Sequence, residues 1–189
     1  MEFEQQYSLE KHIKEYQSGK KSKYIFFWGH QKSKSGEVTA ACFSQWWPSR
    51  FEVNGESYAS TEHWMMAQKA LLFNDHEIYK RIMNAKSPME MKALGREVRG
   101  FREDIWVTNR YRIVVEGNYH KFTQNKELQT FLINTKKRVL VEASPVDTIW
   151  GVGLAADNEK INIPVKWNGL NLLGFALMEV REMIMSKIK

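Results

Sequence analysis

The spacing of apolar and polar residues predicts a few short strands set among longer helices. Residues 24–28, Tyr-Ile-Phe-Phe-Trp, form an aromatic run bounded by turn-like sequence, which is typical of a strand. Asn54 and Gly55 separate two short alternating runs, and this dipeptide is a strong signal for a β-hairpin. The run Arg-Val-Leu-Val-Glu-Ala at 138–143 predicts one further strand.

Helical periodicity covers most of the remaining chain. Ser60 or Thr61 can cap a helix that runs to about Phe73, and Pro88 suits the first turn of another. Gly117 weakens the end of a long helix that the pattern otherwise supports. The predicted helices span residues 8–17, 61–73, 75–85, 87–98, 106–122, 125–135 and 169–187. The regular alternation of strand and helix typical of a doubly wound sheet is absent, so we expect an α+β fold, helix-rich with a few short antiparallel strands.

Length and composition favour one compact domain. The 189 residues are 43% hydrophobic and include seven Trp, ten Phe and seven Tyr, enough for a sizeable core. We place the domain at residues 24–189 and treat residues 1–23 as an N-terminal extension with a short helix. Apolar runs of about 18 residues are absent, which predicts no membrane span. The charged N-terminus does not resemble a secretory signal, and we therefore expect a cytoplasmic protein.

Neither metal nor disulfide chemistry is indicated by the sequence. Cys42 is the single cysteine, which excludes an intrachain disulfide and a multi-cysteine zinc site. The five histidines lack metal-ligand spacing such as His-Glu-x-x-His. The net charge of +6 fits a solvated surface, and it also fits attraction to phosphates on nucleotides or nucleic acid. A general nucleic-acid-binding protein is disfavoured, because the sequence lacks a basic run with interleaved aromatic residues.

The helix predicted from residue 61 carries two charges among apolar side chains. Eight of the twelve residues from Glu62 to Phe73 are apolar, and they surround nearly the whole axis, as in a buried helix. Glu62 and Lys69 are seven residues apart and therefore share a face, with Cα atoms roughly 10 Å apart along the axis. That separation is too long for a good direct pair, but both side chains can converge on a group between them.

Two interpretations of these charges follow. In the structural one, Glu62 and Lys69 each pair with a residue elsewhere and tie the core together, because an unpaired buried charge costs several kcal/mol. In the functional one, the helix forms the floor of a pocket. There a desolvated carboxylate can act as acid or base, and a desolvated lysine can act as a nucleophile.

Other stretches carry further candidate chemistry. Asp147 precedes Trp150, Gly151 and Gly153 in a loop where glycines permit close approach of a flat ligand and Trp offers a stacking surface. A tight turn capped by its own aspartate explains the same residues. Arg96 lies in a cluster of arginines near glycine, which suits a phosphate or an exposed helix face.

Taken together and in order, these stretches resemble the NADAR family, also called YbiA-like. The resemblance rests on "CFSQWWPSRFEVNGESYASTEHWMMAQKALLF", "AKSPMEMKALGR", "EGNYHKFTQNKELQTFLINT", "VLVEASPVDTIWGVG" and "WNGLNLLGFALMEVRE", with a tryptophan at position 106. It runs from about Tyr24 to Met185. The resemblance implies an α+β fold and an N-glycosidase without a metal or redox cofactor.

The resemblance also implies substrates and site residues. Family members cleave bonds between ribose and nitrogen, either in early phosphoribosylamino intermediates of riboflavin synthesis or in ADP-ribose linked to guanine in nucleic acid. The expected catalytic residues are Glu62, Lys69 and Asp147. The expected substrate-binding residues are Gln45, Trp46, Arg96, Trp106, Trp150, Gly151 and Gly153. Gln45 and Trp46 stand where many members have Asn-Phe, which bears on the choice of substrate. The alternative is a non-catalytic module that binds ADP-ribose or a nucleotide.

Overall fold

A computed structural model describes residues 5–188 as two compact units. Met1–Ser44 and Lys126–Lys189 make up one unit, and Gln45–Asn125 makes up the other. Residues 1–4 of the predicted N-terminal extension, and residue 189 at the end of the predicted domain, lie outside the described residues. Each unit is described on its own below.

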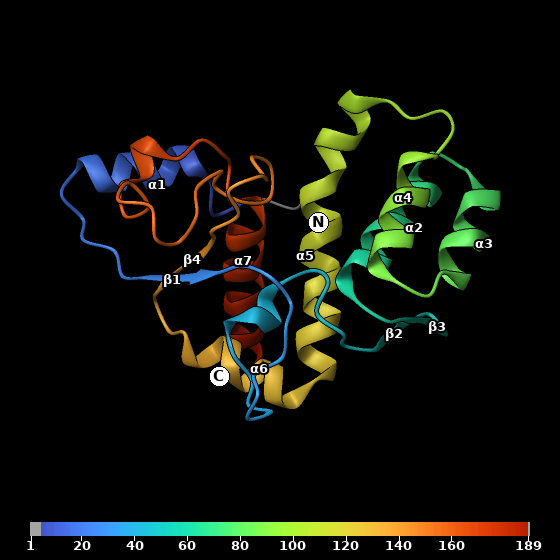
Figure 1. Cartoon of the computed structure of the whole chain (residues 1–189), viewed down its shortest axis with the longest axis horizontal. Helices are drawn as coiled ribbons and strands as arrows, with labels where there is room; N and C mark the ends of the chain where they lie inside the picture. Colours follow the sequence, from blue (N-terminus) through green and yellow to red (C-terminus); the bar gives the residue numbers. More distant parts are fainter. Residues whose placement is uncertain (1–4, 189) are drawn as a thin grey trace. The chain divides into compact units, whose positions relative to one another are not determined.

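The first unit is built on a pair of parallel strands. β1 (Tyr24–Phe27) pairs with β4 (Val139–Glu142) from Tyr24↔Val139 to Phe27↔Glu142. α7 (Leu172–Ile188) packs against β4, as Figure 1 shows in red beside the two strands. The unit also contains α1 (Leu9–Gln17), η1 (Ala40–Phe43), α6 (Lys126–Asn134) and η2 (Pro164–Lys166).

The parallel pairing corrects one part of the sequence prediction. Both strands were expected, but as members of an antiparallel set, and only β2 and β3 pair in that way. Parallel strands need a long crossover connection. Here more than 100 residues, including the whole second unit, separate Phe27 from Val139. No local pattern carries information over such a distance.

The side chain of Asn171 covers part of the second edge of β4, where the Val152 N–H also donates to the Glu142 carbonyl at 3.0 Å. Asn171 is fully buried, and its side-chain carbonyl accepts a hydrogen bond from the Glu142 N–H at 3.0 Å. Its amide donates to the Leu140 carbonyl at 2.9 Å. Unpaired strand groups are costly when they are buried, so Asn171 substitutes for a third strand.

The second unit contains a hairpin and four helices. β2 (Phe51–Val53) and β3 (Glu56–Tyr58) form the antiparallel hairpin that Asn54-Gly55 predicted, and both turn residues have positive φ. The helices are α2 (Thr61–Leu72), α3 (His76–Asn84), α4 (Pro88–Arg96) and α5 (Glu103–Gln124). α2 packs against the other three. The Ser60 hydroxyl caps α2 by accepting from the His63 N–H, as expected.

Gly117 does not end α5, which continues to Gln124. A Cβ at position 117 would lie 2.9 Å from the indole Cγ and Nε1 of Trp64, and closer still to Cδ1. The glycine is therefore the place where α2 comes close to α5. Trp64 is fixed there, because its indole N–H donates to the Ile113 carbonyl at 2.9 Å.

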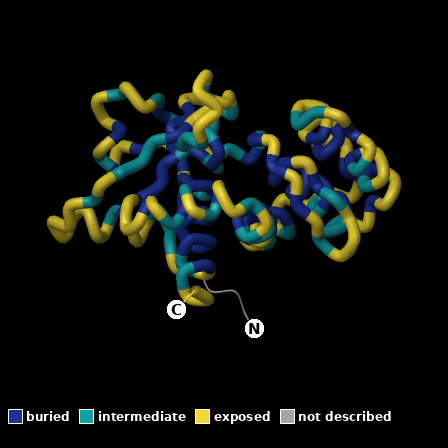
Figure 2. The backbone as a smooth tube through the Cα atoms, turned by 90° about the horizontal axis from the view of Figure 1, so that it is seen from below, coloured by how far each residue is buried: buried dark blue, intermediate teal, exposed yellow. Residues whose placement is uncertain are grey.

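Burial is most extensive in α7 and in the first two turns of α2, the helix that the sequence predicted to be apolar nearly all round. Most of α7 is buried, and in Figure 2 the helix near the C-terminus is dark blue except at its end. In α2, the residues from Thr61 to Ala67 are all buried. Between residues 5 and 188, the structure has no helix that is long and apolar enough to cross a membrane.

Candidate active site

Glu62 lies in the first turn of α2, on the buried part of the helix. Its side chain is 4% exposed, and its backbone N–H donates to the Gln45 carbonyl at 3.0 Å. The Thr61 hydroxyl donates to the same carbonyl at 3.2 Å. A helix N-terminus carries partial positive charge, which stabilises a carboxylate placed beside it.

Lys69 lies two turns further along α2, among groups from α4 and α5. Its Nζ donates to the Gly95 carbonyl at 2.7 Å. The same Nζ lies 4.3 Å from the centroid of the Phe101 ring and 5.6 Å from that of Trp106. Aromatic faces attract cations at such distances. The lysine therefore has a fixed position with an aromatic wall beside it.

The surroundings of Lys69 also favour its neutral, nucleophilic form. Burial lowers the pKa of the Lys69 amine, the negative charge of Glu103 raises it, and the positive charge of Arg96 lowers it. The net shift is downward. A lysine with a lowered pKa is a better nucleophile at neutral pH. Arg96 is exposed at the end of α4, and its effect on Lys69 places it near the amine.

Gln45 lies against the first turns of α2, and Trp46 lies near α4, although the β2–β3 hairpin separates both residues from α2 in the sequence. Gln45 is buried, and its side-chain amide donates to Met65 Sδ at 3.3 Å. The side-chain carbonyl oxygen of Gln45 accepts no hydrogen bond from the described residues. Lys92 Nζ lies 5.8 Å from the centroid of the Trp46 ring. The buried carbonyl of Gln45 is a ready acceptor for a donor on a ligand.

The loop that follows β4 lies in the other unit and is organised by Asp147. One carboxylate oxygen of Asp147 accepts from the N–H groups of Ile149 and Trp150, at 2.9 and 2.7 Å. Gly153 has a φ of +67°, which favours glycine, and a Cβ at Gly151 would lie 2.9 Å from the Asp147 carbonyl. Asp147 therefore holds the loop in shape, as the structural interpretation of this stretch predicted.

The predicted residues thus form two groups. Lys69 and Trp106 lie together in the second unit, with Arg96 acting on Lys69, and Glu62 shares their helix α2. The loop of Asp147 and Trp150 belongs to the first unit.

Three neighbours of Lys69 were missed from the sequence, namely the Gly95 carbonyl, Phe101 and Glu103. Only the packing of α4 and α5 against α2 reveals them. Among residues 5–188, the structure has no group of three or more His, Cys, Asp or Glu side chains that could hold a metal ion.

Comparison with known proteins identifies the family of this chain. The model of the NADAR domain matches residues 26–185, which is most of the chain. The chain belongs to the NADAR family. Its relatives include N-glycosidase R617 of Acanthamoeba polyphaga mimivirus, 47% identical over 166 residues that cover 85% of this chain and 95% of the relative. N-glycosidase YbiA of Escherichia coli is 30% identical over 138 residues, covering 73% of this chain and 76% of that protein.

The fold of this NADAR domain is also found in a solved structure. The NMR structure of the E. coli protein YbiA superposes with a TM-score of 0.70 and 27% identity, covering 89% of each chain. The family assignment and the helix-rich α+β class expected from the sequence are both confirmed. Both of these relatives are named N-glycosidases.

Proposed function

We propose that this NADAR domain hydrolyses the N-glycosidic bond between a ribose and a base nitrogen. The observation that carries the proposal is the environment of Lys69: an amine with a lowered pKa, held beside Trp106 on the helix that also carries the buried Glu62. Relatives of this chain that are named N-glycosidases support the same reaction class.

Glu62 supplies the carboxylate that such a reaction needs. Breaking a ribosyl C–N bond develops positive charge on the sugar and negative charge on the departing base. A carboxylate near the anomeric carbon stabilises that cation or activates the attacking water, as in glycosidases generally. Burial lowers the local dielectric around Glu62 and strengthens its electrostatic interaction with the sugar, and the N-terminus of α2 places partial positive charge beside it.

Lys69 can act either as an acid or as a nucleophile, and its environment favours the nucleophile. As an acid, its ammonium gives a proton to the departing base nitrogen. As a nucleophile, its neutral amine bonds to C1 of the opened ribose while the base leaves with a proton. Water then hydrolyses the resulting imine, which releases the sugar and restores the amine. The lowered pKa favours the nucleophile, because more of the amine is neutral.

The remaining predicted residues hold the substrate. Trp106 and Trp150 stack on the base or exclude water, and Arg96 contacts a phosphate. Gln45 and Trp46 contact the base–ribose conjugate, and the acceptor on Gln45 supports this role. Gly151 and Gly153 allow close approach of a ligand to the loop backbone, and Asp147 orients the ribose hydroxyls.

The substrate is either ADP-ribose linked to guanine in nucleic acid or a phosphoribosylamino-pyrimidine intermediate of riboflavin synthesis. The test is incubation of the protein with each conjugate and mass spectrometry of the products, with Lys69→Ala and Lys69→Arg in parallel. We expect one conjugate to release its free base. Borohydride should trap a protein–sugar adduct that both variants lose, because arginine keeps the charge but forms no Schiff base. Absence of an adduct during turnover would refute the nucleophile, and absence of cleavage would refute the enzyme.

A non-catalytic module for ADP-ribose or a nucleotide is the alternative function. The aromatic wall beside Lys69 and the exposed Arg96 would serve such a module equally well. It would bind the conjugate without ever releasing a base, and Glu62→Gln would leave its affinity unchanged.

A further inference from the structure

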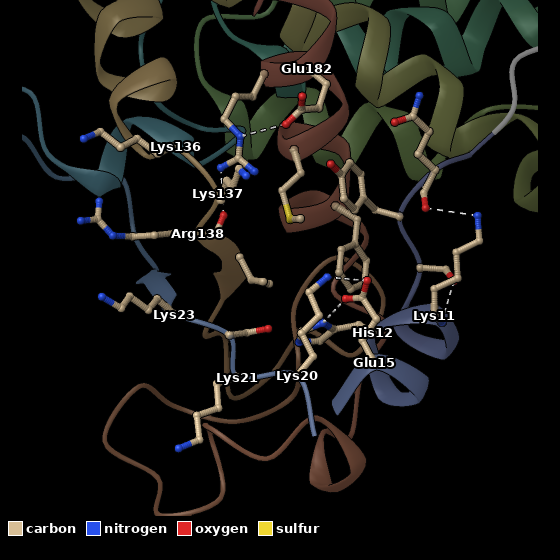
Figure 3. Close-up of a pocket in the computed structure, with 18 residues that line it drawn as sticks. Lys11, His12, Glu15, Lys20, Lys21, Lys23, Lys136, Lys137, Arg138 and Glu182 are labelled. Atoms are coloured by element: carbon tan, nitrogen blue, oxygen red, sulfur yellow. Dashed lines mark hydrogen bonds and ion pairs between the residues drawn. The ribbon is translucent and has the colours of Figure 1, made fainter. Parts of the chain in front are cut away.

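The first unit contains a basic cleft with a volume of about 890 Å³. Its lining comes from three segments: residues 6–23, the turn and strand start at 136–139, and one face of α7. Figure 3 shows its lysine and arginine side chains around the opening. Ten of its 18 lining residues precede residue 26, where the match to the NADAR domain begins. The cleft is therefore built largely from a segment outside the family domain.

The formal charge of the cleft lining equals the net charge of the whole chain. Its lining holds eight Lys and Arg against two Glu, a formal charge of +6. The complete chain has 28 Lys and Arg against 22 Asp and Glu, so the other 20 basic and 20 acidic residues cancel. In the structure, the net positive charge is concentrated at one cleft.

Strand pairing creates this concentration from two short runs of sequence. Lys20, Lys21 and Lys23 precede β1, whereas Lys136, Lys137 and Arg138 precede β4. Because β1 and β4 are parallel and in register from Tyr24↔Val139, the ends of the two basic runs lie next to each other. The Val139 N–H donates to the Lys23 carbonyl at 2.9 Å, which extends the pairing by one residue. Lys21, Lys136 and Lys137 lie outside the strands, and they line the same cleft as Lys23 and Arg138.

Most of these cations have no partner within the part of the chain that the structure describes. Five of these side chains are exposed, and no charged end among them forms an ion pair or hydrogen bond with a described residue. They are the side chains of Lys21, Lys23, Lys136, Lys137 and Arg138. In Figure 3 the charged ends of Lys21, Lys23, Lys136 and Arg138 point to the same side of the cleft. Like charges so close repel one another, and an anion between them relieves that repulsion.

Two buried charges on α7 fix the walls of the cleft. Arg181 is 1% exposed, and its Nη1 donates to Thr135 Oγ1 at 2.8 Å and to the Arg138 carbonyl at 2.9 Å. Glu179 is 3% exposed and accepts from the Gln6 N–H at 2.6 Å and the Tyr7 N–H at 3.1 Å. Arg181 thus ties the turn at 135–138 to α7, and Glu179 ties residues 6 and 7 to the same helix. The backbone in these two parts of the lining is fixed before any ligand arrives, which reduces the entropic cost of binding.

We propose that this cleft binds the phosphate backbone of single-stranded nucleic acid. Five exposed cations that line one cleft, without side-chain partners among the described residues, suit an anion that repeats along a chain. The floor is apolar, made by Val139, Phe175 and Met178, and the half-buried ring of Tyr7 offers a surface on which a base can stack. A membrane fits less well, because the cations line a concave cleft. This proposal rests on the cleft alone and does not depend on whether Glu62 and Lys69 are catalytic.

The test is fluorescence anisotropy of the full chain with a labelled oligothymidine of about 12 nucleotides, at several salt concentrations. Five phosphate contacts predict that the logarithm of the association constant falls with that of the salt concentration with a slope of about −3.5. The variant Lys21→Ala/Lys23→Ala/Lys137→Ala should make this slope less steep by about 2 and weaken binding at low salt by about tenfold or more. The control Lys32→Ala/Lys34→Ala/Lys166→Ala removes the same charge from exposed positions outside the cleft and should bind like the parent chain.

Several outcomes would overturn the proposal. One is no binding by the parent chain, and another is equal weakening in both triple variants, which would indicate general charge attraction. ATP bound as tightly as the oligonucleotide would assign the cleft to small polyphosphates. Binding to phosphatidylserine vesicles but not to the oligonucleotide would assign it to membranes. Glu62→Gln should bind the oligonucleotide like the parent chain, so the result is independent of the proposed catalysis.

Discussion

Replacement of Gly117 by alanine tests how closely α2 must approach α5. The added Cβ would lie 2.9 Å from the Cγ and Nε1 atoms of Trp64, where ordinary contacts are near 3.5 to 4 Å. The indole cannot easily move aside, because its N–H is bonded to the Ile113 carbonyl. Overpacking of this kind costs about 1–3 kcal/mol. The alanine gains about 1 kcal/mol from its higher helix propensity. Because the indole is held in place, we expect the cost of the clash to lie in the upper part of the range of about 1–3 kcal/mol.

The expected net result is a loss of about 1–2 kcal/mol in the free energy of unfolding. With a urea slope of about 2 kcal/mol/M, the midpoint of denaturation falls by about 0.5–1 M. Circular dichroism during urea titration measures this shift. A comparable Gly95→Ala change meets only the thioether of Met66, a flexible side chain, and should cost less.

A double-mutant cycle with Trp64→Phe checks the cause of that loss. Phenylalanine is smaller, so Gly117→Ala should cost at least about 0.5 kcal/mol less in that background. A Gly117→Ala chain as stable as the parent, or more stable, would refute the reasoning. Equal costs in the two backgrounds would refute the role of Trp64.

The remaining predictions concern Lys69 and Asn171. Because burial lowers its pKa, a nucleophilic Lys69 should make kcat rise with pH through a midpoint below the ordinary lysine value. Glu103→Gln should lower the pH of that midpoint, and Arg96→Gln should raise it. A kcat that instead falls as the pH rises through the midpoint would indicate that Lys69 is a proton donor. Asn171→Ala should lower the free energy of unfolding by about 2–4 kcal/mol in urea titration, since two buried backbone groups of β4 lose their partner. A loss below about 0.5 kcal/mol would show that these bonds contribute little.

Features set by local chemistry could be predicted from the sequence. The hairpin at Asn54-Gly55 and the cap at Ser60 depend on residues close in sequence, and both form as expected. The shared face of Glu62 and Lys69 follows from helix geometry alone. The need for glycine at position 117 was missed because the indole of Trp64, which leaves no space for a Cβ there, lies on another helix.

Features set by distant pairing could not be predicted. The parallel register of β1 and β4 joins residues more than 100 positions apart, and it alone brings Lys23 beside Arg138. Likewise, the carbonyl of Gly95 and the ring of Phe101 reach Lys69 only through helix packing. The sequence therefore predicted the charged groups on α2, whereas the structure shows the environment that shifts the pKa of Lys69.

The most direct test of the central claim compares the parent chain with Glu62→Gln on a ribosylated base. Single-turnover release of the base gives the rate, and calorimetric titration gives the affinity for the same conjugate. Glutamine has nearly the same shape but cannot carry the charge, so we expect the rate to fall about 10²–10⁴-fold with affinity little changed. Equal rates for the two proteins would contradict the account, and so would a parent chain that binds the conjugate without releasing its base.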